Sequence, residues 1–314
     1  MMNNIFIFII SLYLVIKGSL LAIEYSEKLA KGLKLSKYII GFMIIAIISI
    51  LPETMISINS AIKGIPDLGL GLIFGSNVAD LTLIFALIVL LSGRSIKVES
   101  KILKKKPIYP FLLLLPLILG LDGYFSRIDG LVLLVVGIIF YYLVLIAHSG
   151  KDTIEQEHIS PIKIRIKNTL LLLFSMILLL IGSHFLVISA IEMSNGFNIS
   201  PIIISMFIIS LGTTMPELFF AYHSVKKGED SLAIGDILGS VLADATIVVG
   251  IIALISPFYF PIKAVYISII FMSVASYLLF SFMKTEKKIS KKEAHLLIIF
   301  WLLFITLEYL SSYF

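Results

Sequence analysis

Long hydrophobic runs, separated by short polar stretches, occupy most of the 314-residue chain. A helix needs about 20 consecutive apolar residues to cross the hydrocarbon core of a bilayer, and ten segments of the chain meet this condition. They lie at roughly 4–23, 38–62, 68–92, 107–121, 128–148, 168–192, 200–225, 232–255, 258–283 and 293–312. The polar stretches between them are too short for a separate soluble domain. The pattern therefore predicts an all-α membrane protein with ten transmembrane helices.

The two halves of the chain repeat each other at a single offset of 164 residues. The matched pairs include Gly18-Ser19 with Gly182-Ser183, Pro52-Glu53 with Pro216-Glu217, Gly75-Ser76 with Gly239-Ser240, and Ala79-Asp80 with Ala243-Asp244. Each half holds five spans, an odd number, so the second half enters the membrane in the opposite sense to the first. We therefore expect two inverted-topology five-helix repeats, at 1–148 and 168–314, joined by a cytoplasmic linker at 149–167. Secondary transporters are often built in this way, with binding sites near the midplane.

Composition and charge support a multi-pass protein of the cell membrane. Hydrophobic residues make up 59% of the chain and charged residues 14%, and the net charge is +5. Lysine and arginine concentrate in alternate loops, which the positive-inside rule assigns to the cytoplasm, with both termini outside. This distribution explains the charge, so we expect the lipid bilayer as a partner, no nucleic acid and no obligatory protein partner. The absence of cysteine excludes disulfides and thiolate metal sites.

Acidic residues inside hydrophobic spans are costly and are functional candidates by default. Glu53 and Glu217 each follow a proline within segments two and seven. Ser49 lies four residues before Glu53, and Thr213 lies four residues before Glu217, so each pair shares one helical face. A proline lacks an N–H and frees the carbonyl four residues earlier. Each segment is therefore expected to be a broken helix with loose carbonyls, which membranes tolerate only against protein or a watery cavity.

Segments three and eight supply a second repeated pair of acids. Ser76 and Asp80, like Ser240 and Asp244, are one helical turn apart. Glycines before them form small-residue faces that allow close packing against segments two and seven. Together the four segments predict a centre of carboxylate, hydroxyl and carbonyl oxygens. Such ligands suit Ca²⁺, Na⁺ or Mn²⁺ better than Zn²⁺ or Cu⁺.

These motifs resemble the sodium/calcium exchanger membrane protein family of the cation/calcium antiporter superfamily. The strongest match is Gly212-Thr213-Thr214-Met215-Pro216-Glu217 with the stretch from Gly239 to Asp244, and the weaker first copy is the stretch from Ser49 to Glu53 with Gly75 to Asp80. The resemblance implies an antiporter, not an enzyme, that moves Ca²⁺ in exchange for Na⁺ as segments one and six slide past the core. It implies a metal site made of Glu53, Asp80, Glu217 and Asp244, supported by Ser49, Ser76, Thr213, Thr214, Ser240 and the carbonyls of Ala46 and Ser210. No cofactor is implied beyond the transported ions.

Two departures from the family pattern bear on the counter-ion. Ile50 stands where the repeat mate, Thr214, carries a hydroxyl. Asp80 occupies a position that is commonly Asn in sodium-coupled members. The site thus gains an acid and loses a hydroxyl, which leaves a Ca²⁺/H⁺ or other divalent cation/H⁺ antiporter as an alternative.

Other functions are also compatible with acids inside the membrane spans. A cation channel also selects cations with acid rings, and a sensor would bind Ca²⁺ without moving it. An intramembrane aspartyl protease is disfavoured because Ala233-Ile234-Gly235-Asp236 lacks the first glycine of its motif. The remaining polar residues receive simpler predictions: Asn77 structural, Asp236 facing a cytoplasmic vestibule, His184 packed or at an interface, Asp122 and Asp129 capping helices, and Glu192 and Glu308 solvated.

Overall fold

The computed structural model describes residues 2–30, 37–98, 108–148, 161–197, 199–260, 262–285 and 287–311. Within these residues, nine helical spans are long and apolar enough to cross a membrane. The tenth expected span, at 107–121, consists of two short helices, α8 (Ile108–Leu113) and α9 (Leu115–Leu119). The break at Leu114 follows from Pro116, which lies in the first turn of α9. The predicted all-helical membrane architecture is confirmed.

Each repeat contributes the same order of elements. The first repeat contains α1 (Met2–Ala30), α2 (Lys37–Ile39), η1 (Ile40–Ile45), α3 (Ala46–Ser49), α4 (Leu51–Ile62), α5 (Pro66–Ala79), η2 (Asp80–Ile84), α6 (Phe85–Ser92), β1 (Ile96–Lys97), α8, α9, β2 (Tyr124–Phe125) and α10 (Arg127–His148). The second contains α11 (Ile162–Phe197), α12 (Pro201–Ile204), η3 (Ser205–Ile209), α13 (Ser210–Thr213), α14 (Met215–Lys226), α15 (Asp230–Ala243), η4 (Asp244–Val248), α16 (Val249–Ile255), β3 (Phe258–Tyr259), α17 (Ile262–Thr285), β4 (Lys288–Ile289) and α18 (Lys291–Ser311). Helix α11 thus begins within the stretch predicted as a linker, of which residues 149–160 lie outside the described part of the chain.

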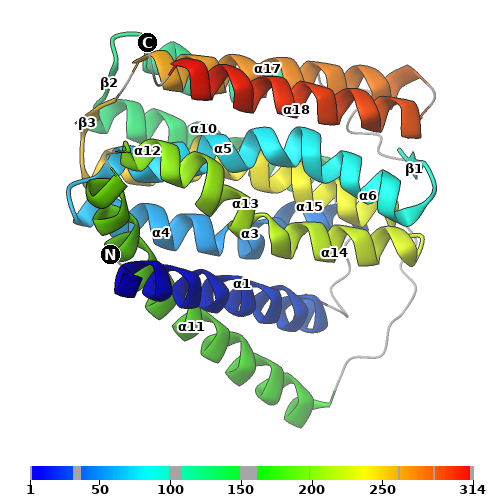
Figure 1. Cartoon of the computed structure of the whole chain (residues 1–314). Helices are drawn as coiled ribbons and strands as arrows, with labels where there is room; N and C mark the ends of the chain where they lie inside the picture. The colour runs from blue at the N-terminus through cyan, green and yellow to red at the C-terminus, as the bar shows by residue number, and fades with distance from the viewer. Residues whose placement is uncertain are drawn as a thin grey trace.

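Two small β-ribbons show that the repeats are inverted. Strand β1 pairs with β4, and β2 pairs with β3, both antiparallel. The 164-residue offset makes β4 the repeat mate of β2. Strand β4 lies beside its partner β1, and Figure 1 shows β1 and the β2–β3 ribbon at opposite ends of the molecule. Elements related by the repeat therefore lie at opposite ends, as inverted topology requires.

The outermost pair of helices, α1 and α11, lie side by side along one edge of the molecule (Figure 1). Gly18 of α1 faces Leu179 of α11, and Gly182 of α11 faces Val15 of α1. Because glycine has no Cβ, both positions let the two backbones approach closely. Both glycines therefore lie at the contact between α1 and α11.

The repeats interlock at the centre of the fold. Helix α15 packs on η1, and α5 packs on η3, so the third span of each repeat contacts the second span of the other. A Cβ added at Gly235 would lie 2.6 Å from the Tyr38 carbonyl oxygen, and one at Gly239 would lie 2.5 Å from that of Phe42. The predicted small-residue faces therefore serve as backbone-to-backbone contacts across the repeat boundary.

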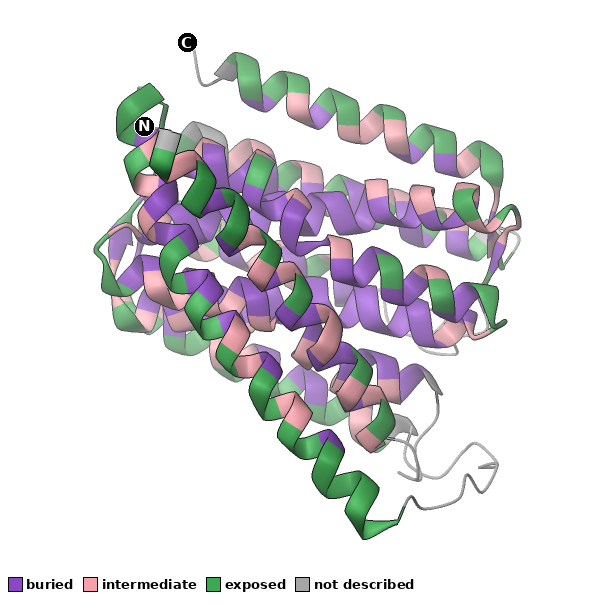
Figure 2. Ribbon diagram, turned by 60° about the horizontal axis from the view of Figure 1, so that its bottom comes forward, coloured by how far each residue is buried: buried purple, intermediate pink, exposed green. Residues whose placement is uncertain are grey.

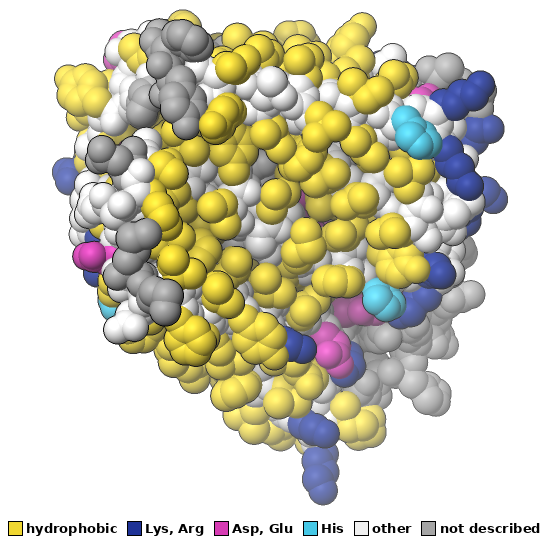
Figure 3. Space-filling model, in the orientation of Figure 1, with side chains coloured by type: hydrophobic (Ala, Val, Ile, Leu, Met, Phe, Trp, Pro, Cys, Tyr) yellow, Lys and Arg dark blue, Asp and Glu magenta, His cyan; other side chains and the backbone are white. Residues whose placement is uncertain are grey.

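Burial follows the membrane environment. Figure 2 shows many exposed residues along α11 and α18, whereas the residues of the helices between them are mostly buried. The face shown in Figure 3 is largely hydrophobic, and lysine and arginine gather mainly on its right-hand side. Apolar outer faces around a buried polar centre are expected for a bundle whose solvent is lipid.

We predict that Gly235→Ala lowers the stability of the purified protein, because the added methyl group meets the Tyr38 carbonyl on a fixed backbone. The cost should lie at the upper end of the roughly 1–3 kcal/mol typical of overpacking. Thermal unfolding in detergent measures it. Gly64→Ala is the control, because its Cβ would meet nothing within 4 Å and only its left-handed backbone (φ 75°) opposes the change, at about 1–2 kcal/mol. If Gly235→Ala lowers the stability no more than Gly64→Ala does, the result would contradict the backbone contact at Gly235.

Candidate cation-binding site

The second span of each repeat is broken at its proline, as predicted. Helix α3 ends at Ser49 and α4 begins at Leu51, with Ile50 between them at φ −77° and ψ 0°. In the second repeat Thr214 takes the same role at φ −78° and ψ −11°. The glutamates therefore lie in the first turn of a new helix, one residue after the proline. The N-terminal turn carries unpaired N–H groups and positive dipole, which favour a carboxylate.

The third span of each repeat changes its hydrogen-bonding period at the aspartate. Segments η2 and η4 are single π-helical stretches that begin at Asp80 and Asp244, positions related by the repeat. Such π-bulges are rare and are frequent at functional sites. The change of period sets the direction in which each aspartate points, and it occurs in both halves of the chain.

The four predicted acids lie together in the centre of the protein. Glu53, Asp80, Glu217 and Asp244 are each at most 2% exposed. Asp80 interacts electrostatically with Glu217, Glu53 and Asp244, and Asp244 with Glu53 and Glu217. The structure thus brings together acids that are far apart in the sequence.

Hydroxyl groups and carbonyls line the space around these acids. Glu217 lies beside Ser49 and Ser240, and Glu53 lies beside Thr213. All five predicted hydroxyls donate to a backbone carbonyl of their own helix: Ser49 to Ala46, Ser76 to Ile73, Thr213 to Ser210, Thr214 to Leu211 and Ser240 to Asp236. Each donated proton leaves the oxygen lone pairs available, so this local bonding is compatible with cation binding.

The carboxylates are short of partners. Within the part of the chain that the structure describes, Glu53 Oε2, Asp80 Oδ1, Glu217 Oε2 and Asp244 Oδ1 are buried without a hydrogen-bond partner. Among the same residues, no lysine or arginine forms an ion pair with any of them. Buried polar atoms are normally satisfied, and a bound cation would satisfy four such carboxylate oxygens.

The acids do not form a compact metal cluster by themselves. In the described ranges no group of three His, Cys, Asp or Glu side chains is close enough to hold a metal ion. A cation at this place would therefore need hydroxyl and carbonyl oxygens in addition to carboxylates. Such mixed sets are usual for hard cations.

Comparison with known proteins agrees with this geometry. The profile of the family described as "Sodium/calcium exchanger protein" matches the chain twice, at residues 3–146 and 167–310. The chain belongs to this family. Its members are transporters that exchange cations across membranes, and the two matches coincide with the two repeats.

Several individual exchangers and membrane proteins are similar over most of their length. The inner membrane protein YrbG of Escherichia coli is 29% identical over 265 residues, which is 79% of each chain. The sodium/calcium exchanger MaX1 of Methanosarcina acetivorans is 22% identical over 349 residues, covering 96% of this chain and 97% of MaX1. A solved structure of the sodium-calcium exchanger NCX_Mj, soaked with Na⁺, superposes with a TM-score of 0.71 at 25% identity, covering 96% of this chain and 98% of that chain.

The exchanger also contains a buried acid that sequence reasoning misplaced. Asp236 was expected in a cytoplasmic vestibule, but it is 0% exposed and its Oδ1 lies 3.1 Å from the Ser49 hydroxyl oxygen. The reason is that Asp236 lies one turn before Ser240 on the face of α15 that packs against the broken span. That four-residue spacing was the available signal. It was overlooked because the repeat mate is Leu72.

The other simple predictions have mixed outcomes. Glu308 was expected to be solvated, but it is 3% exposed in α18 and accepts a hydrogen bond from Ser268 of α17 at 2.6 Å. Glu192 is exposed, as expected. Asn77 donates to the Val241 carbonyl of the other repeat at 3.3 Å, which suits a structural role.

The helix-cap predictions and the histidine prediction also differ in outcome. Asp129 forms a capping box with Ser126 at the start of α10, as predicted. Asp122 accepts instead from the N–H of Tyr124 within the turn. His184 is exposed on α11, so it is not packed within the exchanger.

We predict that Ca²⁺ raises the thermal unfolding midpoint of the detergent-purified exchanger, because a ligand that binds the native state adds about 2.7 kcal/mol at a hundredfold excess over Kd. Glu53→Gln should remove most of this shift. Glu308→Gln should keep it, since Glu308 is also a buried membrane glutamate but contacts Ser268 instead. A full Ca²⁺ shift in Glu53→Gln would contradict the assignment of Glu53 to the site.

Proposed function

We propose that this exchanger moves Ca²⁺ across the cell membrane in exchange for Na⁺ by alternating access. The observation that carries the proposal is the set of four repeat-related acids, buried together at broken helices with oxygens that lack partners. Membership of the sodium/calcium exchanger family supports it. So does the similarity to NCX_Mj, whose structures were soaked with Na⁺, Ca²⁺ or Sr²⁺.

The proposed roles follow the charge of each ligand. Ca²⁺ prefers several carboxylates, so Glu53 and Glu217 hold it at the centre, with Asp80 and Asp244 beside them. Na⁺ carries half the charge and is served by positions rich in neutral oxygens. The hydroxyls and carbonyls that supply these positions are Ser49, Ser76, Thr213, Thr214, Ser240, Ala46 and Ser210.

Charge balance explains why one ion must replace the other. Four ionised carboxylates in a low-dielectric interior repel one another and resist desolvation. One Ca²⁺ or several Na⁺ ions neutralise enough of this charge for the site to pass through an occluded state. With neither ion bound, the uncompensated charge opposes the conformational change, so transport is coupled exchange.

The arrangement of α1 and α11 suits a sliding pair. They pack closely on each other at Gly18 and Gly182, and so move as a unit. Their contacts with the core lie next to the broken spans: Leu12 of α1 covers Gly212, and Ser183 of α11 accepts a hydrogen bond from Asn59 of α4 at 2.9 Å. A shift of the pair would therefore open or cover the site from one side of the membrane at a time.

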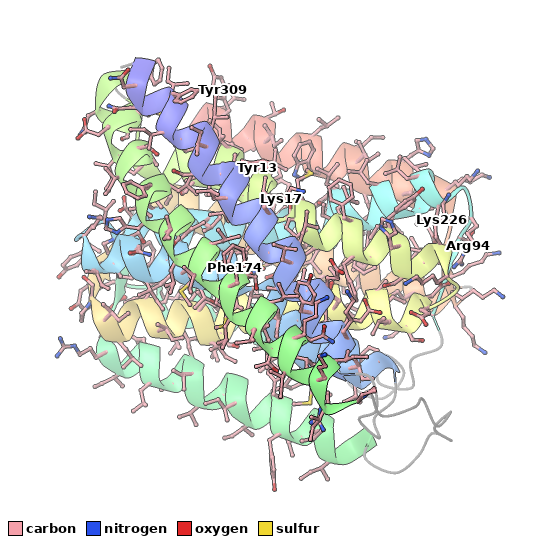
Figure 4. The ribbon with its side chains drawn as sticks, turned by 90° about the horizontal axis from the view of Figure 1, so that it is seen from below. Tyr13, Lys17, Arg94, Phe174, Lys226 and Tyr309 are labelled. Carbon is pink, nitrogen blue, oxygen red and sulfur yellow. The ribbon has the colours of Figure 1, made fainter. Side chains whose placement is uncertain are left out.

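The distribution of charge supports cytoplasmic basic loops and external termini. Arg94 and Lys226 lie together at one end of the molecule, whereas Tyr309, near the C-terminus, lies at the other (Figure 4). Both termini lie at the end opposite β1 in Figure 1. By the positive-inside rule, the Arg94 end faces the cytoplasm.

A second candidate, Ca²⁺/H⁺ exchange, is favoured by one residue. Asp80 adds a fourth acid to the centre and interacts with all three others, where sodium-coupled relatives commonly have an amide. A carboxylate can bind a proton as the counter-ion, but an amide cannot. The two candidates therefore differ in which gradient drives Ca²⁺.

We expect an outward Na⁺ gradient to drive ⁴⁵Ca²⁺ uptake into proteoliposomes, because Na⁺ leaving the lumen empties the site for Ca²⁺. An outward H⁺ gradient without Na⁺, at matched membrane potential, is the comparison. Uptake driven only by H⁺ would replace the proposal by Ca²⁺/H⁺ exchange. Rapid Ca²⁺ flux that needs neither counter-ion would indicate a channel.

We also expect Glu217→Gln to abolish ⁴⁵Ca²⁺ uptake, because the change removes a central charge and one carboxylate ligand. Glu308→Gln should transport like the wild type, since Glu308 accepts a hydrogen bond from Ser268 of α17 and is not one of the four central acids. Matched protein amounts and size-exclusion profiles control for misfolding. Normal transport by a well-folded Glu217→Gln variant would exclude the proposed centre.

A further inference from the structure

Two buried tyrosines outside the proposed cation site hold α15, the helix that leads into Asp244. Tyr109 of α8 donates a hydrogen bond to the Leu238 carbonyl of α15, and Tyr141 of α10 donates one to the Gly239 carbonyl at 2.6 Å. Each tyrosine is only 5% exposed. Helices α8 and α10 belong to the first repeat and α15 to the second. Two helices of one repeat therefore fix one helix of the other.

Aromatic packing sets the direction of both hydroxyls. The Tyr141 ring packs against Phe42 with centroids 5.2 Å apart, and the Tyr109 ring against Phe280 with centroids 5.1 Å apart. A tyrosine has only two side-chain rotations, so a packed ring leaves its hydroxyl little freedom. Gly239 is thus enclosed between the Tyr141 hydroxyl and the backbone of Phe42.

The contacted carbonyls lie just before the place where the helix changes its hydrogen-bonding period. In an α-helix the carbonyls of Leu238 and Gly239 accept from the N–H groups four residues later, which are the last two before Asp244. From there the period lengthens, and the Val249 N–H bonds to the Asp244 carbonyl. Tyr141 also interacts electrostatically with Asp244. The two hydroxyls therefore act on the turn that orients a central carboxylate.

The corresponding helix of the first repeat, α5, does not receive these hydroxyls. The repeat mate of Tyr109 is Ser273, which donates to Ile269 of its own helix. The repeat mate of Tyr141 is Ile305, which has no side-chain donor. The π-helical stretch η2 nevertheless begins at Asp80. The change of period thus forms without tyrosine donors, which leaves the position of α15 as the property that Tyr109 and Tyr141 determine.

The position of α15 matters because a cation site distinguishes ions by the space between its ligands. Selectivity among hard cations depends on cavity size, ligand number and flexibility. Sr²⁺ has the same charge as Ca²⁺ and a larger radius. Helix α15 carries Ser240 and leads into Asp244, whereas Glu53 lies on α4. If α15 is held firmly, these oxygens cannot move apart to suit the larger ion.

We propose that Tyr109 and Tyr141 are positioning residues that hold α15 near the other ligands and thereby make the exchanger prefer Ca²⁺ to Sr²⁺. Neither hydroxyl touches the ion, because both are directed at the carbonyls of Leu238 and Gly239. The inference rests on the proposed transport of Ca²⁺ and names the groups that set its selectivity among divalent cations.

The test removes the hydroxyls but keeps the rings, in Tyr109→Phe, Tyr141→Phe and the double variant. Uptake of ⁴⁵Ca²⁺ into Ca²⁺-loaded proteoliposomes is measured with Sr²⁺ as competitor, so the result does not depend on the counter-ion. In the double variant the preference for Ca²⁺ over Sr²⁺ should fall by about tenfold, equivalent to about 1.4 kcal/mol, and the maximal Ca²⁺ rate should stay near the wild-type value. Each single variant should show part of this fall.

Tyr266→Phe is the matched control. Its hydroxyl also donates to a backbone carbonyl, that of Leu121 at 2.8 Å, but this carbonyl is not part of α15. The same chemical change should therefore leave the preference for Ca²⁺ over Sr²⁺ at the wild-type value.

Two outcomes overturn the inference. One is an unchanged preference in a double variant with a normal size-exclusion profile. The other is an equal loss of affinity for both ions, because a general loosening of the fold weakens both and keeps their ratio. The single variants decide the question if the double variant does not fold. Absence of Ca²⁺ exchange in the wild type would contradict the proposed function instead, so the two failures are distinguishable.

A rescue experiment separates the hydrogen bond from the bulk of the hydroxyl. In place of Tyr141, 4-aminophenylalanine keeps a donor for the Gly239 carbonyl, whereas 4-methylphenylalanine keeps the size without the donor. The amino variant should restore the preference for Ca²⁺, and the methyl variant should behave like Tyr141→Phe. Equal restoration by both would show that packing alone positions α15, and the inference would fail.

Discussion

The cost of holding ionised carboxylates in a hydrocarbon layer governs the rest of this structure. Four acids lie almost fully buried at the centre, and in the described chain no basic side chain neutralises them. Buried charge without compensation is strongly destabilising, so the protein needs mobile cations to do what a lysine or arginine would otherwise do. A fixed basic partner would remove the need for transported ions. The absence of one is therefore the physical basis for exchange.

That constraint accounts for the crossed packing of the core. The four acids converge from both repeats, and broken helices expose carbonyls only where protein surrounds them. Glycines on α5 and α15 let these helices contact η3 and η1 through their backbones. The close approach brings Ser49 of one repeat within 2.8 Å of Ser240 of the other. A bulkier interface would keep the hydroxyls apart and leave each half with an incomplete set of oxygens.

The sequence alone predicts much of this arrangement, for physical reasons that also mark its limits. Spans follow from hydropathy, and the Pro-Glu and Ala-Asp repeats locate the four acids because few other pressures place such residues in lipid. The start of α11 at Ile162 could not be predicted, since a polar helix end and a polar linker look alike in hydropathy. Glu308 was misplaced because its partner, Ser268, lies in another helix and has no sequence signal. The π-helical turns at Asp80 and Asp244 depend on a shift in hydrogen-bond register that residue types do not encode.

The two repeats differ in residue type at a few positions in their second and third spans. An inverted pair with identical halves would present the same ligands to ions arriving from either side. Here the halves differ beside the central acids: the repeat mate of Thr214 is Ile50, and the repeat mate of Asp236 is Leu72. Both differences give the second repeat an oxygen-bearing side chain where the first repeat has an apolar one. The backbone of the two halves is thus nearly symmetric, but the polar side chains that it presents to the centre are not. A polarity mismatch between repeat mates therefore marks where the two halves of an inverted repeat differ in chemistry, as Asp236 does beside Ser49.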